Sequence, residues 1–90
     1  MVEKTFTITA EEGLHARPAS VLAKECMKFN CDLKLYKGED RGKAFQPKSI
    51  LSIMTIGAVS GDVVTIQAEG ADETSAIERL EVLFATDFEG

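Results

Sequence analysis

The sequence predicts an α+β fold, an open-faced sandwich in which a four-stranded antiparallel sheet carries three helices on one face. Segments in which apolar and polar residues alternate are interleaved with segments of helical period, in the order βαββαβα. The chain has 90 residues and contains neither internal repeats nor a linker, so residues 1–90 form a single domain.

Four segments have the pattern of strands, and they cover residues 4–10, 32–36, 43–46 and 62–69. In the first, Phe6 and Ile8 alternate with threonines, as expected of a half-buried strand. The second and third are joined by a turn over residues 37–42 and are predicted to form a hairpin.

Three segments have helical spacing or helix boundaries. The first covers residues 16–29, with Pro18 in its first turn. A short helix over 50–56 is predicted between Ser49 as N-cap and Gly57 as stop, with Ile53 and Ile56 in the core. Asp72 is predicted to cap the last helix, whose apolar stripe is Ala76, Ile77, Leu80, Leu83 and Phe84.

Composition and charge restrict the function. The chain has no apolar run near the ~20 residues of a membrane span, its N-terminus lacks the pattern of a signal peptide, and two cysteines make no disulfide framework. We therefore expect a cytoplasmic monomer without a cofactor. The net charge of −5 argues against a general nucleic-acid binder.

The charge is divided unevenly along the chain. Residues 1–50 hold nine Lys/Arg and seven Asp/Glu, a net +2, whereas residues 51–90 hold one and eight, a net −7. An anionic ligand or acidic partner is therefore expected to meet the N-terminal half.

The single histidine, His15, lies where a strand ends and a helix begins. A helix N-terminus offers free N–H groups and partial positive charge, Arg17 adds a forked cation suited to phosphate oxygens, and Gly13 permits a tight approach. An imidazole that is largely neutral at cytosolic pH can accept a phosphoryl group and release it again. The sequence therefore predicts a phosphorylatable His15.

Other interpretations of His15 are open from local physics alone. A lone histidine at this position is often a helix cap or an ordinary surface residue. A zinc site is disfavoured, because such a site needs three or four ligands and Cys26 and Cys31 are eleven and sixteen residues away. No spacing indicates a catalytic triad. We assign the two cysteines no chemistry, and place Cys26 in the core.

The run from Gly13 to Ala19, Gly-Leu-His-Ala-Arg-Pro-Ala, resembles the active-site signature of the HPr family, the histidine phosphocarriers of the bacterial sugar phosphotransferase system. The segments 48–51 and 54–57 resemble the family's regulatory serine region. Residues 61–64 and 69–73 resemble its last strand and the entry to its last helix. The resemblance covers essentially the whole chain.

The resemblance implies a role for each matching residue. His15 would take the phosphoryl group on Nδ1 from phosphorylated enzyme I, and would donate it to IIA domains of sugar permeases. Arg17 and the backbone N–H groups of Ala16 and Arg17 would hold the phosphoryl group. Ser49 would be phosphorylated by HPr kinase/phosphorylase, in connection with a catabolite-control transcription factor. The protein would be a carrier and not an enzyme.

A docking surface is predicted beside these two sites, formed by Ala19, Ser20, Lys24, Lys28, Ile50, Leu51 and Met54. The side chains of Ile50, Leu51 and Met54 cannot all point inward from one short helix, and Arg17, Lys24 and Lys28 lie on one helical stripe. The alternative is that Ser49 is only a cap, that the apolar cluster is core and that the basic stripe is a solvated face.

The sequence departs from the usual family pattern in two places. The turn over 37–42 is longer by two or three residues, and Pro47 is uncommon in its segment. Three functions compete: the general sugar phosphocarrier, a nitrogen-branch or regulatory paralogue, and an unrelated α+β interaction module. The segment Ser49-Ile50-Leu51 favours the sugar branch.

Overall fold

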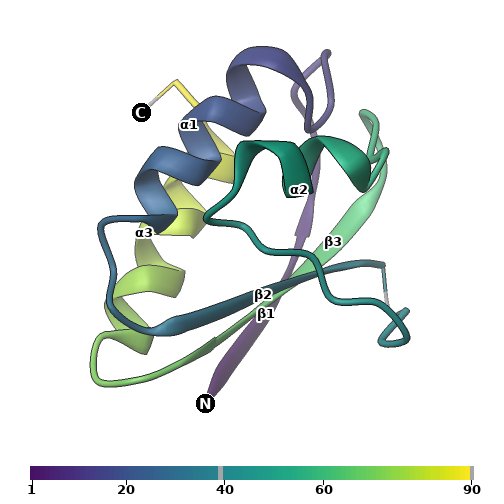
Figure 1. Cartoon of the computed structure of the whole chain (residues 1–90). Coiled ribbons are helices and arrows are strands. Elements are labelled where there is room, and N and C mark those ends of the chain that lie inside the picture. Colours follow the sequence, from purple (N-terminus) through teal and green to yellow (C-terminus); the bar gives the residue numbers. More distant parts are fainter. Residues whose placement is uncertain (39, 90) are drawn as a thin grey trace.

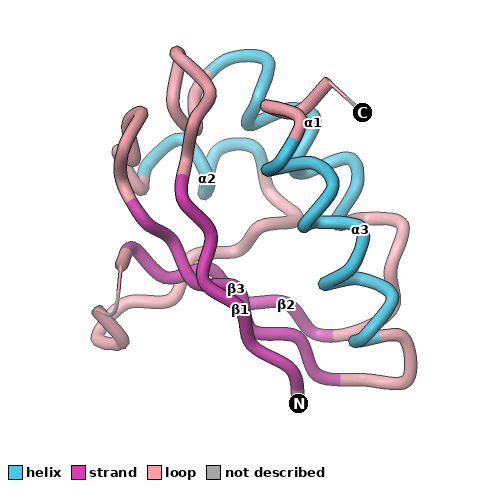
Figure 2. The backbone as a smooth tube through the Cα atoms, turned by 180° about the vertical axis from the view of Figure 1, so that it is seen from behind, coloured by secondary structure: helices cyan, strands magenta, loops and turns pink. Residues whose placement is uncertain are grey.

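A computed structural model describes residues 1–38 and 40–89 of the chain (Figure 1); Glu39, in the predicted turn, and Gly90 lie outside the described residues. The elements follow in the order β1 (Val2–Thr7), α1 (Ala16–Cys26), β2 (Asp32–Lys37), α2 (Ile50–Thr55), β3 (Val63–Glu69) and α3 (Glu73–Ala85). All three helices lie on the same side of the sheet (Figure 2), so the predicted open-faced α+β architecture is confirmed.

The sheet has β3 at its centre, with β1 and β2 paired antiparallel on either side. Thr65 of β3 lies opposite both Thr5 of β1 and Tyr36 of β2. The last strand in sequence, β3, thus lies between the first two. Its pairs with β1 and β2 join residues that are about 30 to 60 positions apart in the sequence.

The predicted fourth strand is not confirmed. Within the described residues the sheet has three strands, and the segment 43–46 contributes a single antiparallel bridge between Phe45 and Leu35. The reason lies in the two residues that follow Phe45. The N–H of Gln46 donates to the hydroxyl of Ser52 at 2.8 Å, and Pro47 has no N–H to donate. The chain therefore turns into α2 instead of extending the ladder.

The core lies between the sheet and the helices. Phe6 in β1 and Leu33 and Leu35 in β2 are buried, as the alternation predicted. β3 instead buries three consecutive residues, Val64, Thr65 and Ile66. α1 and α3 meet this face with fully buried leucines and α2 with Ile53, and the predicted apolar stripe of α3 is buried throughout. The period-2 and period-3.6 patterns thus predicted the two layers that meet.

The end of α1 and the cap of α3 differ from prediction. Helix α1 ends at Cys26, three residues short of Phe29, and the chain leaves it through a tight turn. Asp72 occupies the N-cap position of α3 but makes no capping bond within the helix. Its carboxylate instead accepts from the N–H groups of Asn30 and Cys31 at 2.8 and 2.9 Å, so it ties the α1–β2 connection to α3.

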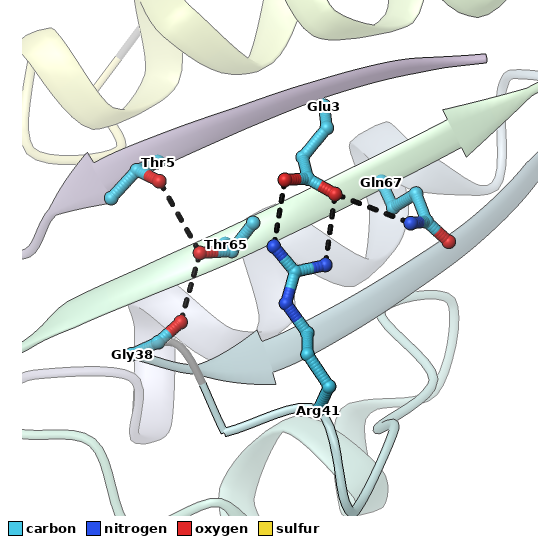
Figure 3. A network of polar contacts seen from close by, with 6 residues as sticks. All are labelled: Glu3, Thr5, Gly38, Arg41, Thr65 and Gln67. Carbon is cyan, nitrogen blue, oxygen red and sulfur yellow. Dashed lines mark hydrogen bonds and ion pairs between the residues drawn. The ribbon is translucent and has the colours of Figure 1, made fainter.

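The long connection after β2 folds over the open face of the sheet. The guanidinium of Arg41 donates to both carboxylate oxygens of Glu3 in β1, at 2.8 and 2.7 Å, and Gln67 of β3 donates to the same carboxylate (Figure 3). The guanidinium also lies 4.8 Å from the centre of the Tyr36 ring. On the face without helices, Arg41 therefore contacts β1 and β2 directly, and the Glu3 carboxylate that it binds also accepts from Gln67 of β3.

No helix in the described part of the chain is long and apolar enough to cross a bilayer.

Candidate functional site

His15 lies at the N-cap position of α1, on the exposed surface. Its backbone is extended, with φ −142° and ψ 158°, and its side chain makes no capping hydrogen bond to any described residue. The prediction that His15 joins a strand-to-helix connection to a helix start is confirmed. The ring is accessible to a partner protein and is not committed to capping the helix.

The backbone just before His15 is fixed by a close contact with the α2–β3 connection. The N–H of Leu14 donates to the carbonyl of Ala58 at 3.0 Å, and the Leu14 side chain is buried. Gly13 has φ +69°, and a Cβ at this position would lie 2.5 Å from the Ala58 oxygen and 2.7 Å from the Cα of Val59. Only glycine fits this approach, as the sequence predicted.

Ala16, the first residue of α1, has a left-handed φ of +53°. A residue with a Cβ pays roughly 1–3 kcal/mol for such a conformation, and strained residues of this kind concentrate at functional sites. This conformation was not predicted from the sequence, because alanine is an ordinary residue for a helix start. The N–H groups of Ala16 and Arg17 belong to the first turn, where the helix supplies no acceptor for them.

Arg17, the second residue of α1, is half-exposed, and its side chain reaches the segment that follows α3. Its Nη1 donates to the carbonyl oxygen of Phe88 at 3.0 Å and lies 4.0 Å from the Glu89 carboxylate. Sequence reasoning missed both partners. They are 71 and 72 positions away, and an aromatic residue near a chain end carries no signal of a polar contact.

Ser49 is the N-cap of α2, as predicted. Its backbone is extended, with φ −119°, and its Oγ accepts from the N–H of Ser52 at 3.3 Å. The preceding residue, Lys48, donates from Nζ to the carbonyl oxygens of Phe29 and Cys31 at 2.9 and 3.0 Å. The segment before α2 is therefore held against the end of α1, and the two helices pack side by side (Figure 1).

The predicted apolar cluster beside Ser49 is exposed to different degrees. Leu51 is 76% exposed, Ile50 is also exposed, and Met54 is half-buried against the core. Ile53 is fully buried, as predicted for a core residue, and so is Ile56. We call Ile50, Leu51 and Met54 the α2 patch. The alternative that the whole cluster belongs to the core is wrong.

The predicted docking residues of α1 divide in the same way. Ala19 is fully buried, so the prediction that it contacts a partner is wrong; Ser20 is half-buried and Lys24 is exposed. Lys28 lies beyond the end of α1, and its Nζ pairs with the Glu25 carboxylate at 3.0 Å. The helical stripe of basic residues therefore contains Arg17 and Lys24 only.

Both cysteines are free and buried. Burial raises the pKa of the Cys26 thiol to about 12, and burial likewise raises the pKa of Cys31. Both thiols are thus held in the protonated, weakly nucleophilic form. Cys26 lies in the core, as predicted.

Comparison with known proteins gives consistent results. The family model described as "PTS HPr component phosphorylation site" matches residues 2–86. The phosphocarrier protein HPr of Vibrio cholerae is 43% identical over 83 residues, covering 92% of this chain and 94% of that protein; HPr of Buchnera aphidicola is 39% identical over the same shares. The crystal structure of HPr-C-His from Thermoanaerobacter tengcongensis superimposes with a TM-score of 0.90 at 38% identity, covering 100% of this chain and 98% of that one.

Proposed function

The chain belongs to the HPr family, the phosphocarriers of the phosphotransferase system, and we propose that it carries the phosphoryl group on His15. The family's members are carriers and not enzymes. The observation that supports His15 most directly is its position: an exposed imidazole, uncommitted to capping, at the N-terminus of α1 and two residues from Arg17.

The chemistry follows from this position. A ring nitrogen of His15, which the family resemblance assigns as Nδ1, attacks the phosphorus atom of a phosphorylated donor. A nitrogen–phosphorus bond forms as the bond from phosphorus to the donor breaks, and the donor group keeps the electron pair. The negative charge on the phosphoryl oxygens is met by Arg17 and by the first N–H groups of α1. The reverse steps deliver the group to an acceptor.

The open surface around His15 suits a carrier. The described part of the surface forms no pocket, so a donor or acceptor protein supplies the remaining walls when it docks. We assign enzyme I as donor and IIA domains of sugar permeases as acceptors, both in the cytoplasm, with this protein acting as a monomer. The proposed docking surface consists of the α2 patch and Lys24, because Leu51, Ile50 and Lys24 are exposed and α1 packs beside α2.

Ser49 is proposed as the regulatory phosphorylation site, with HPr kinase/phosphorylase as its kinase and a catabolite-control transcription factor as a reader. The capping position tolerates a phosphate, which adds roughly −1.5 to −2 charges. Those charges would stand next to the α2 patch and repel an acidic enzyme I. A Ser49→Asp variant should accept phosphoryl groups from enzyme I more slowly than wild type; transfer at the wild-type rate would contradict the regulatory role.

The test of the carrier function supplies phosphoenolpyruvate and enzyme I and looks for a phosphoryl adduct that is stable in base and labile in acid. His15→Ala should abolish this adduct, whereas Lys34→Gln, on the exposed face of β2, should leave it unchanged. An adduct that persists in His15→Ala would place the acceptor elsewhere. Incubation with ATP and the kinase tests separately for an acid-stable adduct lost in Ser49→Ala.

A further inference from the structure

The last described residues, 86–89, form a folded segment that turns back from α3 toward the start of α1. Asp87 and Phe88 both have left-handed backbones, with φ 53° and 65°. The N–H of Phe88 donates to the carbonyl of Leu83 at 2.7 Å, and that of Asp87 to the carbonyl of Phe84 at 3.5 Å. This is the Schellman pattern of a helix end, which fixes the direction of the following residues.

The Phe88 side chain anchors this segment in the core. It is 2% exposed, and its ring meets the ring of Phe84 edge-on, with centroids 4.9 Å apart. Phe84 in turn stacks on Phe6 of β1 at 4.5 Å. A second tie is made by the hydroxyl of Thr9, which donates to the Asp87 carboxylate. The segment is thus held both by the core and by the connection that leads to His15.

This anchoring fixes one acceptor for Arg17. An arginine side chain has many rotamers, and holding it in one geometry costs conformational entropy. The Phe88 carbonyl oxygen takes one of the five guanidinium N–H donors, at 3.0 Å from Nη1, and leaves the others for phosphoryl oxygens. The Glu89 carboxylate is 4.0 Å away and its side chain is 73% exposed, so it constrains the guanidinium much less.

We propose that Phe88 is a positioning residue for phosphoryl transfer: its buried ring holds its own carbonyl oxygen where that oxygen orients Arg17 beside His15. The inference rests on the proposed function, because it assigns a task to the residue that stabilises the phosphoryl group there. Phe88 itself touches neither the phosphoryl group nor the partner protein. Its effect reaches the site only through Arg17.

The test measures steady-state phosphoryl transfer from phosphoenolpyruvate through enzyme I to this protein, and the concentration of this protein is varied to separate kcat from KM. Phe88→Ala should lower kcat about tenfold and leave KM unchanged, because the docking surface is intact. Phe88→Leu, which restores an apolar anchor, should recover most of the rate. Glu89→Gln should transfer at nearly the wild-type rate.

Two controls separate positioning from a loss of stability. Phe45→Ala truncates a half-buried phenylalanine on the β2 side of the sheet, away from Arg17; it should lower the melting temperature but not kcat. In an Arg17→Ala background, Phe88→Ala should cause no further loss of rate. Unfolding of each variant is followed in parallel, and rates are measured below its transition.

The outcomes are distinguishable. If wild type forms the base-stable adduct and Phe88→Ala transfers at the wild-type rate, or slows Arg17→Ala by a further factor of ten, the inference is wrong and the carrier function stands. If wild type forms no adduct that His15→Ala abolishes, the proposed function fails and the inference fails with it.

Discussion

His15 depends on the conformations of residues that do no chemistry themselves. Gly13 lets the backbone pass against Ala58, Leu14 fastens it there, and Ala16 carries a left-handed φ at the first helical position. The imidazole is therefore placed by the backbone on both sides of it, while its side chain makes no capping hydrogen bond within residues 1–38 and 40–89. This arrangement leaves the proposed nucleophile exposed while its backbone position is fixed.

Gly13 provides the sharpest test at this scale, because Gly57 is its matched control. Both have φ +69°, but a Cβ at Gly57 meets nothing within 4 Å. Gly57→Ala should cost about 1 kcal/mol in the free energy of unfolding, the strain of a left-handed alanine. Gly13→Ala should cost about 2 kcal/mol more, because the Ala58–Val59 backbone must also move. Urea unfolding measures both, and equal losses would show that the contact at Gly13 is not tight.

Residue-scale prediction from sequence succeeded where the signal was local. The helix start after His15, the glycine requirement at Gly13 and the cap at Ser49 each depend on neighbours within a few positions, and all three are confirmed. The hydrogen bond between Arg17 and Phe88 was not predicted, because it joins residues that are 71 positions apart in the sequence. The role of Asp72 was missed for the same reason: its carboxylate had local N–H groups to cap but binds distant ones instead.

Among the elements, the connection from β2 to α2 is the one that sequence described least well. Its greater length was predicted, but its contacts were not. Arg41 crosses the open face to Glu3 (Figure 3). Phe45 makes one bridge to β2. A short segment in which apolar and polar residues alternate predicts a strand whether or not a neighbouring strand can form a ladder of hydrogen bonds with it. Here Ser52 and Pro47 decided the matter, and both act from outside the segment.

The Arg41–Glu3 contact predicts a pH dependence of stability. Hydrogen bonds from Arg41, and then from Gln67, lower the pKa of Glu3 from 4.5 to about 2. A carboxylate with a depressed folded-state pKa stabilises the fold above its unfolded pKa, and this contribution is lost as the pH falls through the folded one. Unfolding measured between pH 5 and pH 2 should show wild type losing more stability than Glu3→Gln. Glu12→Gln, at an exposed site in the β1–α1 connection, is the control and should follow wild type.

The contact between α1 and α3 predicts unequal effects of two cations. Burial alone would raise the pKa of Glu25, but hydrogen bonds from Arg79 and Lys28 overcome it and lower that pKa. The Arg79 bond, at 2.6 Å, links the two helices, whereas Lys28 is 67% exposed. Arg79→Ala should cost about 2 kcal/mol and Lys28→Ala less than about 1 kcal/mol in urea unfolding. Equal losses in the free energy of unfolding would show that a bond between two helices stabilises the fold no more than an exposed ion pair within one segment.

In the whole molecule, the two-layer architecture follows from periodicity, while the strand order β1-β3-β2 does not. Alternation indicates which face of each strand is buried but not which strands are neighbours. Placing the most apolar strand, β3, at the centre is consistent with its burial by strands on both sides and by helices on one face. The order of the strands within the sheet was not predicted, and it comes from the structure.

The uneven charge of the chain predicts how fast it meets an acidic donor. Arg17 and Lys24 lie two helical turns apart on the same face of α1, in the half of the sequence with net charge +2. Association with enzyme I, followed by stopped flow, should slow as salt rises, because the Debye length shrinks from about 10 Å at 0.1 M to about 3 Å at 1 M.

Lys24→Gln should lower the association rate constant on the order of twofold at low salt and converge with wild type at high salt. Lys34→Gln removes the same charge from the open face of the sheet, between the buried Leu33 and Leu35, and should have a smaller effect. An equal loss in both variants would indicate that only net charge matters. The donor would then be steered by the whole molecule and not by the face of α1 that carries His15 at its start.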